Sequence, residues 1–470
     1  MSRSILAAAC ALLSASAPRV AFVFALLAAT SSGGCSAEAV PGDSEGLSAG
    51  AATDENRTVD PLLHAAVTEK RFPGAVVHAG VIMDPSRPED DQTFTRAYGT
   101  MAYDTRLVTE ETRYDLASVT KVLGTTTAVM REVDKGRLRL DAKVRDVLPE
   151  LSPAYATMTV KSLLSHTSCL ADGPPPGSLA DLKGRGADAT KVVAFMNLHA
   201  ARIFLGACSP TYSDLNMVLA GAVVQKTSGK RLDVYLRDEV FAPLGMTKTG
   251  FNPSASEKPS VAPTEVYVAA DRAGRRGAIV GEVHDETSFY FGGVGGNAGL
   301  FSTAGDVGKL IRALLTDRIV GRTTRDLFFA SQGVRDQLGA TRALGWEIAP
   351  AHCGKGFGPR TVGHTGFAGT SVCIDPDQGV YTVVLTNRVF PSRLGKSIHP
   401  DRVALSAALV DKVSPCVLRP RWTVCGNTQQ GGFSGKSGIL YACAANGNRA
   451  TVCPRGCVSA PAGTADHCGP

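Results

Sequence analysis

The sequence has little net charge, no block of basic residues and no cluster of side chains at metal-ligand spacing. Its 49 Lys and Arg residues against 43 Asp and Glu residues leave a formal charge of +6 over 470 residues, which argues against a nucleic-acid partner. The apolar stretch at 20–29 is too short to span a bilayer. With 44 % hydrophobic and 20 % charged residues, the composition is that of a globular protein with enough apolar side chains for a large core. We expect no cofactor and no metal.

The first 35 residues have the composition of an export signal. Arg3 and Arg19 supply positive charge ahead of the apolar stretch 20–29, and small residues precede Cys35. This arrangement resembles a bacterial lipoprotein signal, in which Cys35 would be lipidated and would anchor the protein to a membrane. Ordinary secretion with cleavage nearby is the alternative. We therefore predict a signal peptide over 1–35 and an exported protein, either a periplasmic or outer-membrane lipoprotein or a secreted one.

Composition divides the rest of the chain into three segments. Residues 36–58 are rich in small and acidic residues without apolar periodicity, which predicts a flexible linker. They contain a Gly-x-Ser-x-Gly pattern at 42–46, but no strand precedes it and no helix follows it, so it is not a nucleophile elbow. Residues 59–413 have the periodic apolar pattern of a folded domain, and residues 414–470 form a separate module.

The tail at 414–470 contains six of the 12 cysteines and few large apolar residues. A segment this short buries little core, and an exported protein can form disulfides. We therefore expect disulfide bonds here rather than the metal knuckle that CPRGC at 453–457 would suggest. No pairing is assigned. The tail is either a stabilising or anchoring module or a site of cell-wall or carbohydrate contact.

A Ser-x-x-Lys tetrad, Ser118-Val119-Thr120-Lys121, opens a helix-like run. Three residues are nearly one helical turn, so the Ser118 hydroxyl and the Lys121 ammonium should lie on one face within reach of each other. A serine hydroxyl is a weak nucleophile until a neighbour takes its proton. A lysine whose charge is disfavoured by burial could be that acceptor. The alternatives are an N-cap serine and a solvated surface lysine.

Two later motifs carry polar groups suited to the same chemistry. Tyr212-Ser213-Asp214 precedes an apolar-periodic run, and a phenol beside a lysine ammonium has a lowered pKa and can act as a general base. His364-Thr365-Gly366 lies in a segment with the alternation of an edge strand, where a glycine lets a substrate approach the backbone closely.

These three motifs, in this order, resemble the Ser-x-x-Lys, Tyr-x-Asn and Lys-Thr-Gly elements of the serine β-lactamase and penicillin-binding-protein superfamily. The sequence is most similar to the class C β-lactamase-like serine hydrolases, which include esterases, D-amino-acid peptidases and penicillin-binding-protein-4B-like proteins. The resemblance extends from residue 59 to residue 413 and includes the segments LLSHTS (163–168), GEVHDE (281–286) and LTNRV (385–389).

The resemblance implies a role for each motif residue. Ser118 would be the nucleophile, Lys121 would assist removal of its proton, and Tyr212 would serve as base in acylation and as acid toward the leaving group. The backbone N–H groups of Ser118 and Phe367 would form the oxyanion hole. The residues expected to contact the substrate are Asp214, His364, Thr365 and Gly366.

Three positions depart from the family pattern. Asp214 replaces the usual Asn, and because a carboxylate only accepts hydrogen bonds, this change weakens the β-lactamase interpretation. His364 replaces the usual Lys, so it would hold a substrate carboxylate only when protonated, near its ordinary pKa of about 6.5. Cys169 follows LLSHTS where a Gly is usual, and it either pairs with Cys208 or both remain small buried thiols.

The elements predict an α/β fold of the β-lactamase and transpeptidase type. Strands at both ends with helices between them fit an antiparallel sheet built from both chain ends and flanked by helices, with a helical subdomain. The expected strands are 75–83, 94–101 and 379–387, and the expected helices are 118–135, 160–164, 190–200, 213–228, 232–242 and 401–413. We expect structural roles for His166 and His284 and a glycine-rich turn beside the active site at 293–296.

Together these features predict an exported serine hydrolase that acts through an acyl-enzyme on an ester or a D-amino-acid-containing peptide. Its substrate would be a small molecule or derived from peptidoglycan. One alternative is a class C-type β-lactamase, and another is a catalytically silent cell-wall-binding or penicillin-sensing protein. The intact Ser118, Lys121 and Tyr212 argue against the silent protein.

Overall fold

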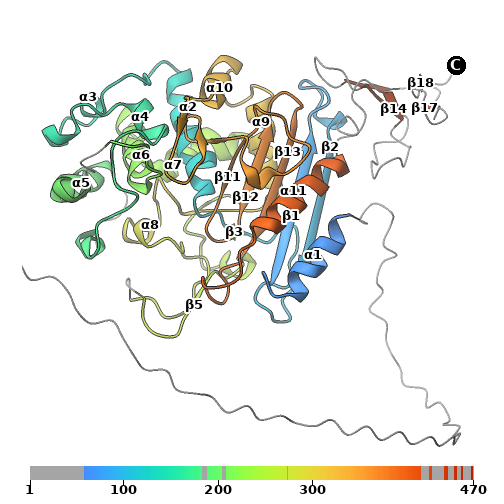
Figure 1. The fold of residues 1–470 in the computed structure, drawn as a ribbon, viewed down its shortest axis with the longest axis horizontal. Coiled ribbons are helices and arrows are strands. Elements are labelled where there is room, and N and C mark those ends of the chain that lie inside the picture. Colours follow the sequence, from blue (N-terminus) through green and yellow to red (C-terminus); the bar gives the residue numbers. More distant parts are fainter. Residues whose placement is uncertain are drawn as a thin grey trace, which may run out of the picture. The chain divides into compact units, whose positions relative to one another are not determined.

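The computed structural model describes residues 58–182, 188–203, 208–271 and 274–413, together with short strands between 423 and 468. Its centre is an eight-stranded antiparallel sheet in the order β2-β1-β13-β12-β11-β10-β9-β8 (Figure 1). Because β1 pairs with both β2 and β13, the two ends of the domain build one sheet, as predicted. The strands are β1 (Gly74–Val81), β2 (Gln92–Gly99), β8 (Val334–Arg335), β9 (Thr341–Arg342), β10 (Glu347–Ile348), β11 (Val362–Thr365), β12 (Ser371–Asp375) and β13 (Val380–Thr386).

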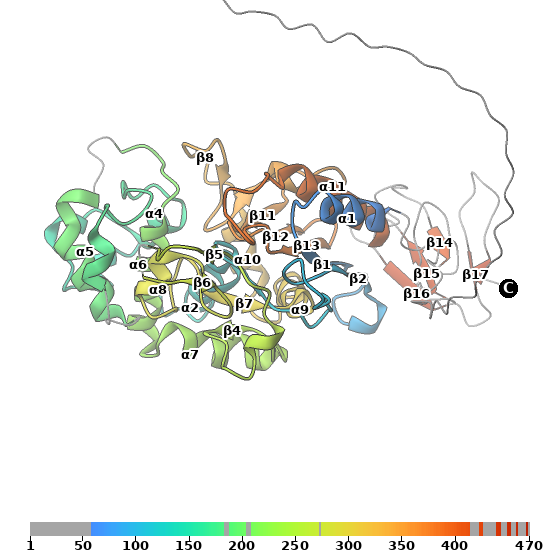
Figure 2. The ribbon, with the colours of Figure 1, turned by 90° about the horizontal axis from the view of Figure 1, so that it is seen from below.

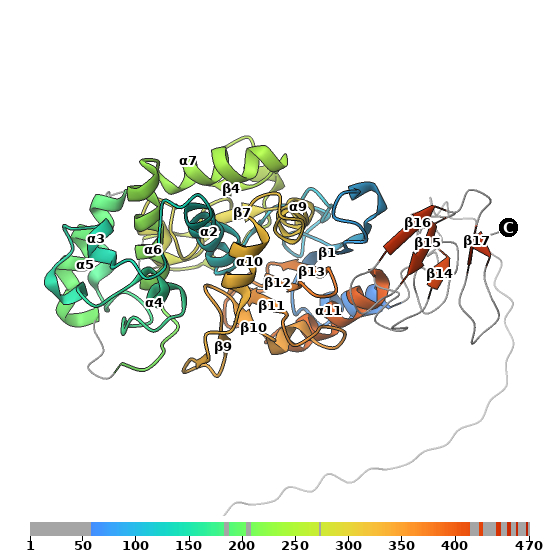
Figure 3. The same cartoon turned by 90° about the horizontal axis from the view of Figure 1, so that it is seen from above.

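Helices cover both faces of this sheet. On β1, Val77 packs in the cluster that contains residues of α1 (Val59–Thr68) and α11 (His399–Val413), whereas Val76 packs on the opposite face with residues of α9 (Ala304–Leu315). Figure 3 shows the sheet between α9 and α11. All residues of β1 and β13 are buried, which agrees with their mostly apolar sequences on both faces of the strand.

The middle of the chain forms the predicted helical subdomain. Helices α4 to α6 gather at one end of the domain (Figure 2), and α3 lies with them (Figure 3). Helix α6 begins after Ser213, whose side chain accepts a hydrogen bond from the Asn216 backbone, and it ends at Gly229, whose φ of 70° suits glycine. The remaining helices are α2 (Thr127–Asp134), α3 (Val144–Val147), α4 (Val160–Leu164), α5 (Ala189–Ile203), α6 (Asp214–Ser228), α7 (Leu232–Leu236), α8 (Glu286–Tyr290) and α10 (Arg322–Phe329).

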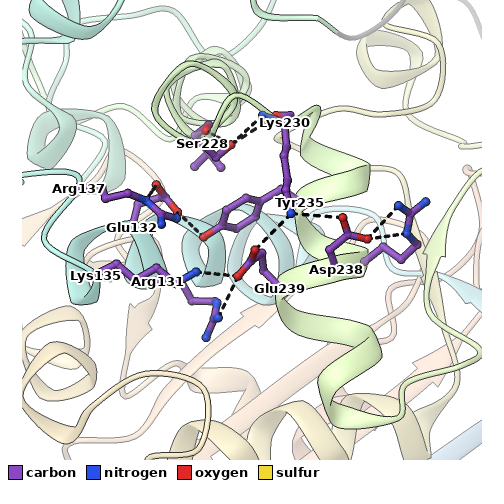
Figure 4. A network of polar contacts seen from close by, with 11 residues as sticks. Arg131, Glu132, Lys135, Arg137, Ser228, Lys230, Tyr235, Asp238 and Glu239 are labelled. Carbon is purple, nitrogen blue, oxygen red and sulfur yellow. Dashed lines mark hydrogen bonds and ion pairs between the residues drawn. The ribbon is translucent and has the colours of Figure 1, made fainter.

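A polar network fixes α2 against α7 and the turn that follows it (Figure 4). The buried carboxylate of Glu132 accepts hydrogen bonds from the Tyr235 hydroxyl and from Arg137, whose Nε lies 2.8 Å away. Glu239 accepts one from the Lys135 ammonium at 2.6 Å. Since α2 continues the helix that starts at Ser118, this network holds the far end of the helix that carries the Ser-x-x-Lys tetrad.

Two smaller sheets complete the domain, and two more lie in the tail. One sheet joins β3 (Tyr114–Asp115), β7 (Leu300–Ser302) and β4 (Gly250–Phe251), and another pairs β5 (Val266–Tyr267) with β6 (Gly277–Ala278). The tail strands form two sheets, β14 (Thr423–Cys425), β15 (Ile439–Ala442) and β16 (Arg449–Val452), and β17 (Cys457–Val458) and β18 (His467–Cys468). Cys35, the linker and the tail's cysteine side chains lie outside the described residues. Within the described part of the chain, no helix is both long and apolar enough to cross a membrane.

The prediction that the His-Thr-Gly segment is an edge strand is wrong for β11 as a whole. β11 pairs with β12 on one side and with β10 on the other. The β10 pairing reaches only Val362 and Gly363, so among the described residues His364 and Thr365 have no strand neighbour on that side. These two motif residues therefore lie at an unpaired edge of β11.

Candidate active site

Ser118 and Lys121 lie together at the start of the helix that follows β3. The Lys121 Nζ donates to Ser118 Oγ at 3.0 Å, so the predicted approach of the two groups is confirmed. The backbone N–H of Lys121 also donates to the Ser118 carbonyl oxygen at 3.0 Å. The helix starts with a π-helical segment, Lys121–Thr126, before α2, a local irregularity that is frequent at functional sites.

The Lys121 ammonium is 1 % exposed and surrounded by oxygen atoms. Its Nζ lies 2.7 Å from the Asp214 carboxylate and donates to the Asn297 carbonyl oxygen at 2.9 Å. Burial by itself would lower the pKa of Lys121, but the Asp214 charge and the Tyr212 phenol outweigh it and raise the pKa. The expectation that burial turns Lys121 into a proton acceptor is therefore wrong for this arrangement, because Asp214 keeps the ammonium charged.

The Tyr212 ring stands beside the same pair of residues. Its centroid lies 5.1 Å from Lys121 Nζ, and its hydroxyl hydrogen-bonds with Lys121 and Ser118. Burial raises the pKa of Tyr212, and the Lys121 charge lowers it less than burial and the Asp214 charge raise it. The predicted lowering of this pKa is wrong, chiefly because burial disfavours a tyrosinate, and the Asp214 charge opposes the help that the Lys121 ammonium would give.

Backbone contacts hold the segment that carries Tyr212. The Thr211 N–H donates to the His166 carbonyl oxygen at 2.9 Å, and the Ser213 N–H donates to His166 Nδ1 at 3.1 Å. The Tyr212 N–H donates to Gln337 Oε1 at 2.8 Å. His166 is itself buried, and it fixes the backbone on both sides of Tyr212, in agreement with the structural role expected for it.

A disulfide ties the same segment to the loop after α4. Cys169 and Cys208 are bonded, with their Cα atoms 4.8 Å apart, so the pairing interpretation is confirmed over two free thiols. Cys169 has a φ of 65°, a left-handed conformation that explains why a glycine is usual there. A second disulfide, Cys353–Cys373, was not predicted. His352 lies within 4.8 Å of both sulfur atoms, but the disulfide engages both cysteines, so this group does not form a metal site while it is oxidised.

The turn after β11 packs directly against the residues before Ser118. The Thr370 hydroxyl donates to the Leu116 carbonyl oxygen at 2.8 Å, and a Cβ at Gly366 would come within 2.5 Å of the same oxygen. Glycine is therefore needed for this close approach. In the described part of the chain, the backbone N–H groups of Ser118 and Phe367 donate to no protein acceptor. Both are thus available to an oxygen atom of a bound molecule.

His364 is buried in the wall of the site. Its Nδ1 lies 2.8 Å from the Thr365 carbonyl oxygen, which can only accept, so Nδ1 carries the proton and Nε2 is left without a partner. Burial, reinforced by the charges of Arg342 and Lys121, lowers the pKa of His364 well below its ordinary value. The expectation of protonation near pH 6.5 is therefore wrong, and His364 offers a neutral acceptor rather than a cation.

The Thr365 side chain, at the end of β11, is half-buried. It lines a cavity of about 380 Å³ together with Glu347, His352 and Arg402. Arg402, from α11, also donates to the Gly366 carbonyl oxygen at 2.7 Å and so holds the turn that carries Phe367. The first two residues of the His-Thr-Gly motif therefore face different surroundings, with His364 buried beside Tyr212 and Thr365 lining the cavity.

The sequence profile of the family described as Beta-lactamase matches residues 59–405, the segment that contains all of these groups. This chain belongs to the Beta-lactamase family. Among its relatives, an Escherichia coli K12 protein named "Putative D-alanyl-D-alanine carboxypeptidase" is 30 % identical over 309 residues, which cover 60 % of this chain and 70 % of that protein. The N-acetylmuramyl-L-alanine amidase of Bacillus subtilis is 30 % identical over 375 residues, which cover 72 % and 81 %.

A solved structure has the same fold as this domain. The class C β-lactamase from Rhodobacter sphaeroides matches with a TM-score of 0.55 at 19 % identity, over 75 % of this chain and 98 % of that one. The predicted β-lactamase and transpeptidase fold is therefore confirmed. At this identity the likeness concerns the fold alone, whereas the relatives named above are hydrolases by name.

Four residues of the site were not predicted from the sequence. They are Asn297, Gln337, Arg342 and Arg402. Only Asn297 had a local signal, because it follows the glycine-rich turn that was expected beside the site. That expectation is confirmed, since the Gly296 carbonyl oxygen accepts from Thr125 at 2.6 Å and Asn297 accepts from Lys121. Arg342 is fully buried, with its guanidinium 5.1 Å from the Tyr212 ring centroid, but no pattern in the sequence relates it to Tyr212.

Proposed function

We propose that this Beta-lactamase family protein is an exported serine hydrolase that acts through an acyl-enzyme on esters or D-amino-acid-containing peptides. The observation that carries the proposal is the 3.0 Å contact between Ser118 Oγ and Lys121 Nζ beneath the Tyr212 phenol. A surface lysine or a simple N-cap serine would not require a charged ammonium held at 1 % exposure next to a serine hydroxyl. The substrate would be a small molecule or a fragment of peptidoglycan.

The first chemical step would be attack of Ser118 Oγ on the substrate carbonyl carbon. Lys121 donates to Ser118 Oγ and Tyr212 hydrogen-bonds with it, so the serine proton can pass to the phenol oxygen when Tyr212 is ionised. The new oxyanion would accept from the free N–H groups of Ser118 and Phe367. The protonated Tyr212 would then give its proton to the leaving group, and a water molecule would release the acyl group from Ser118.

Asp214 favours an esterase or peptidase over a β-lactamase. In the usual motif an Asn can donate to a substrate carbonyl oxygen, whereas the Asp214 carboxylate here accepts from Lys121 at 2.7 Å. The names of the two relatives, a carboxypeptidase and an amidase, point to peptide-like substrates of the cell wall. His364 also departs from the usual lysine, because a neutral imidazole gives no positive charge at this position.

Two acylating reagents test the proposal. The purified protein is incubated with p-nitrophenyl acetate, to measure turnover, and with a fluorescent penicillin, and the labelled peptide is identified by mass spectrometry. We expect Ser118-dependent turnover of the ester, which Ser118→Ala abolishes without a change in melting temperature. Rapid hydrolysis of the penicillin would instead support the class C-type β-lactamase. Absence of ester turnover, with or without stable penicillin labelling, would support the silent binding protein. Full turnover by folded Ser118→Ala would refute the nucleophile.

Export, anchoring and the tail belong to the same proposal. A lipid on Cys35 would hold the enzyme at a membrane, and residues 414–470 would contact the cell wall or a carbohydrate. Truncation after Val413 is expected to leave ester turnover unchanged and to reduce sedimentation with isolated cell walls. Unchanged sedimentation would leave the stabilising function, and loss of turnover in a soluble truncated protein would show that the domain boundary is wrong.

A further inference from the structure

Two arginines approach the ring of Phe367, the residue after the His-Thr-Gly motif. The ring is 48 % exposed. The Arg388 guanidinium carbon lies 4.8 Å from the ring centroid and that of Arg393 lies 5.9 Å away. The His284 imidazole also stacks on this ring, with centroids 5.8 Å apart. Two guanidinium groups and an imidazole therefore surround the ring of the residue that is expected to give the second oxyanion donor.

The two arginines differ in their partners. Arg393 lies 2.7 Å from a Glu265 carboxylate oxygen and 3.0 Å from one of Glu286, so its charge is neutralised. The half-buried Arg388 has no ion pair and donates no hydrogen bond among the described residues. Burial lowers the pKa of Arg388, and no carboxylate raises it again. The guanidinium of Arg388 faces the Phe367 ring and has no anionic partner among the described residues, so it is available to an anion of a bound molecule.

The residues on either side of Arg388 are held by packing and by hydrogen bonds close to the motif residues. Val389 packs with Ala117 and Ala368, the neighbours of Ser118 and Phe367. On the other side, the Asn387 side-chain amide donates to the carbonyl oxygens of Met101 and Pro263 at 2.7 and 2.8 Å. Arg388 is thus attached to the same small cluster that holds the proposed oxyanion site.

From these contacts we infer that Arg388 is an anion-recognition residue that binds a carboxylate of the substrate through its planar guanidinium. This inference rests on the proposed function and makes it narrower, because it selects carboxylate-bearing esters or peptides over neutral ones. His364 does not supply this charge, since it is neutral and buried. Arg402 uses its Nη2 to hold the carbonyl oxygens of Gly366 and Thr370, which places its guanidinium behind the turn and away from the Phe367 ring contact made by Arg388.

Matched pairs of esters test the inference. Mono-p-nitrophenyl glutarate and p-nitrophenyl butyrate differ by a carboxylate on the acyl side, and 3-acetoxybenzoate and phenyl acetate differ by one on the leaving group. The measured quantity is the ratio of kcat/KM for the charged and neutral member of each pair. A charge-assisted, bidentate contact corresponds to a preference of about 10–100-fold, so Arg388→Gln should lower the ratio by that factor in one pair. Arg388→Lys should retain part of the preference, because lysine keeps the positive charge but cannot donate two parallel hydrogen bonds to a carboxylate.

The control removes an equal charge elsewhere. Arg139 is 79 % exposed and pairs with Asp141 on the surface, so Arg139→Gln should leave both ratios unchanged. The preference of the wild type should also decline as sodium chloride is added. Ratios that Arg388→Gln leaves unchanged in both pairs, while Ser118-dependent turnover persists, would overturn the inference alone. Loss of Ser118 dependence for every ester would overturn the proposed function instead.

Discussion

Replacement of Asp214 by asparagine is expected to move the acidic limb of the pH–rate profile to lower pH. The Asp214 carboxylate lies 2.7 Å from Lys121 Nζ, and its charge raises the pKa of both Lys121 and Tyr212. An uncharged amide at 214 removes this contribution from both groups. The deprotonated form of Tyr212, which accepts the Ser118 proton in the proposed mechanism, then becomes populated at lower pH.

The size of the shift follows from the geometry. Two unit charges at this separation interact by about 6 kcal/mol at an effective dielectric constant of about 20. Asp214 is 27 % exposed, so water screens much of this interaction. One pKa unit corresponds to about 1.4 kcal/mol, and a shift of about one to two units is therefore expected. At a fixed pH on the acidic limb, kcat/KM should rise by about 10-fold for each unit.

The assay is kcat/KM for p-nitrophenyl acetate between pH 5 and pH 10, corrected for spontaneous hydrolysis. Asp172→Asn is the matched control, because the exposed Asp172 carboxylate is also near Asp214 but makes only a weak contribution there. Its profile should coincide with that of the wild type. An acidic limb that stays in place or moves to higher pH in Asp214→Asn would refute the conclusion that the Asp214 charge raises the pKa of Lys121 and Tyr212. A Tyr212→Phe change in the Asp214→Asn background then tests the phenol, with an expected loss of about 10²–10⁴-fold.

Three further outcomes follow from the contacts. Gly366→Ala should lower kcat by about 10²–10³-fold. The new Cβ would meet a backbone carbonyl oxygen at 2.5 Å and displace the turn that offers an oxyanion donor. Ester kinetics measure this loss, and the melting temperature distinguishes it from unfolding. Tyr235→Phe should reduce the free energy of unfolding by about 1–3 kcal/mol in urea titrations, because it removes a donor from the buried Glu132 carboxylate. The Lys135 ammonium contributes most to lowering the pKa of Glu239 to about 2. The Glu239 carboxylate therefore stabilises the fold above its unfolded pKa, and this contribution is lost as the pH falls toward 2. The urea midpoint of the wild type should fall between pH 5 and pH 2.5, and that of Glu239→Gln should fall less.

Much of the local structure could be predicted because its determinants lie close together in the chain. The expected helix 160–164 coincides with α4, and the expected helix 213–228 coincides with α6 and its serine cap. The expected helix 232–242 is less regular, since α7 ends at Leu236 and a π-helical segment, Arg237–Phe241, follows. Capping and apolar periodicity act within a few residues, so they identify an element more reliably than they describe its last turn.

The sequence by itself also determined which groups meet at Ser118. The spacing of Ser118 and Lys121 fixes their contact within one turn, and the resemblance of the three motifs identified the family that the profile later showed. Cys169 could be singled out because it stands at a position where a glycine is usual, and its left-handed backbone gives the physical reason. These conclusions depend on which residues occur and in what order. Such patterns either act within a few positions of the chain or are shared by the members of a family.

Only the tertiary structure decided the protonation of the site. The directions of the pKa shifts of Lys121, Tyr212 and His364 depend on desolvation and on charges brought from other parts of the chain, above all Asp214 and Arg342. The sequence predicted the wrong direction for the pKa of Tyr212 because it showed the ammonium but neither the burial of the phenol nor the position of the Asp214 carboxylate. Electrostatic energies depend on separation and burial rather than on order along the chain, and these quantities exist only once the sheet and its helices have packed.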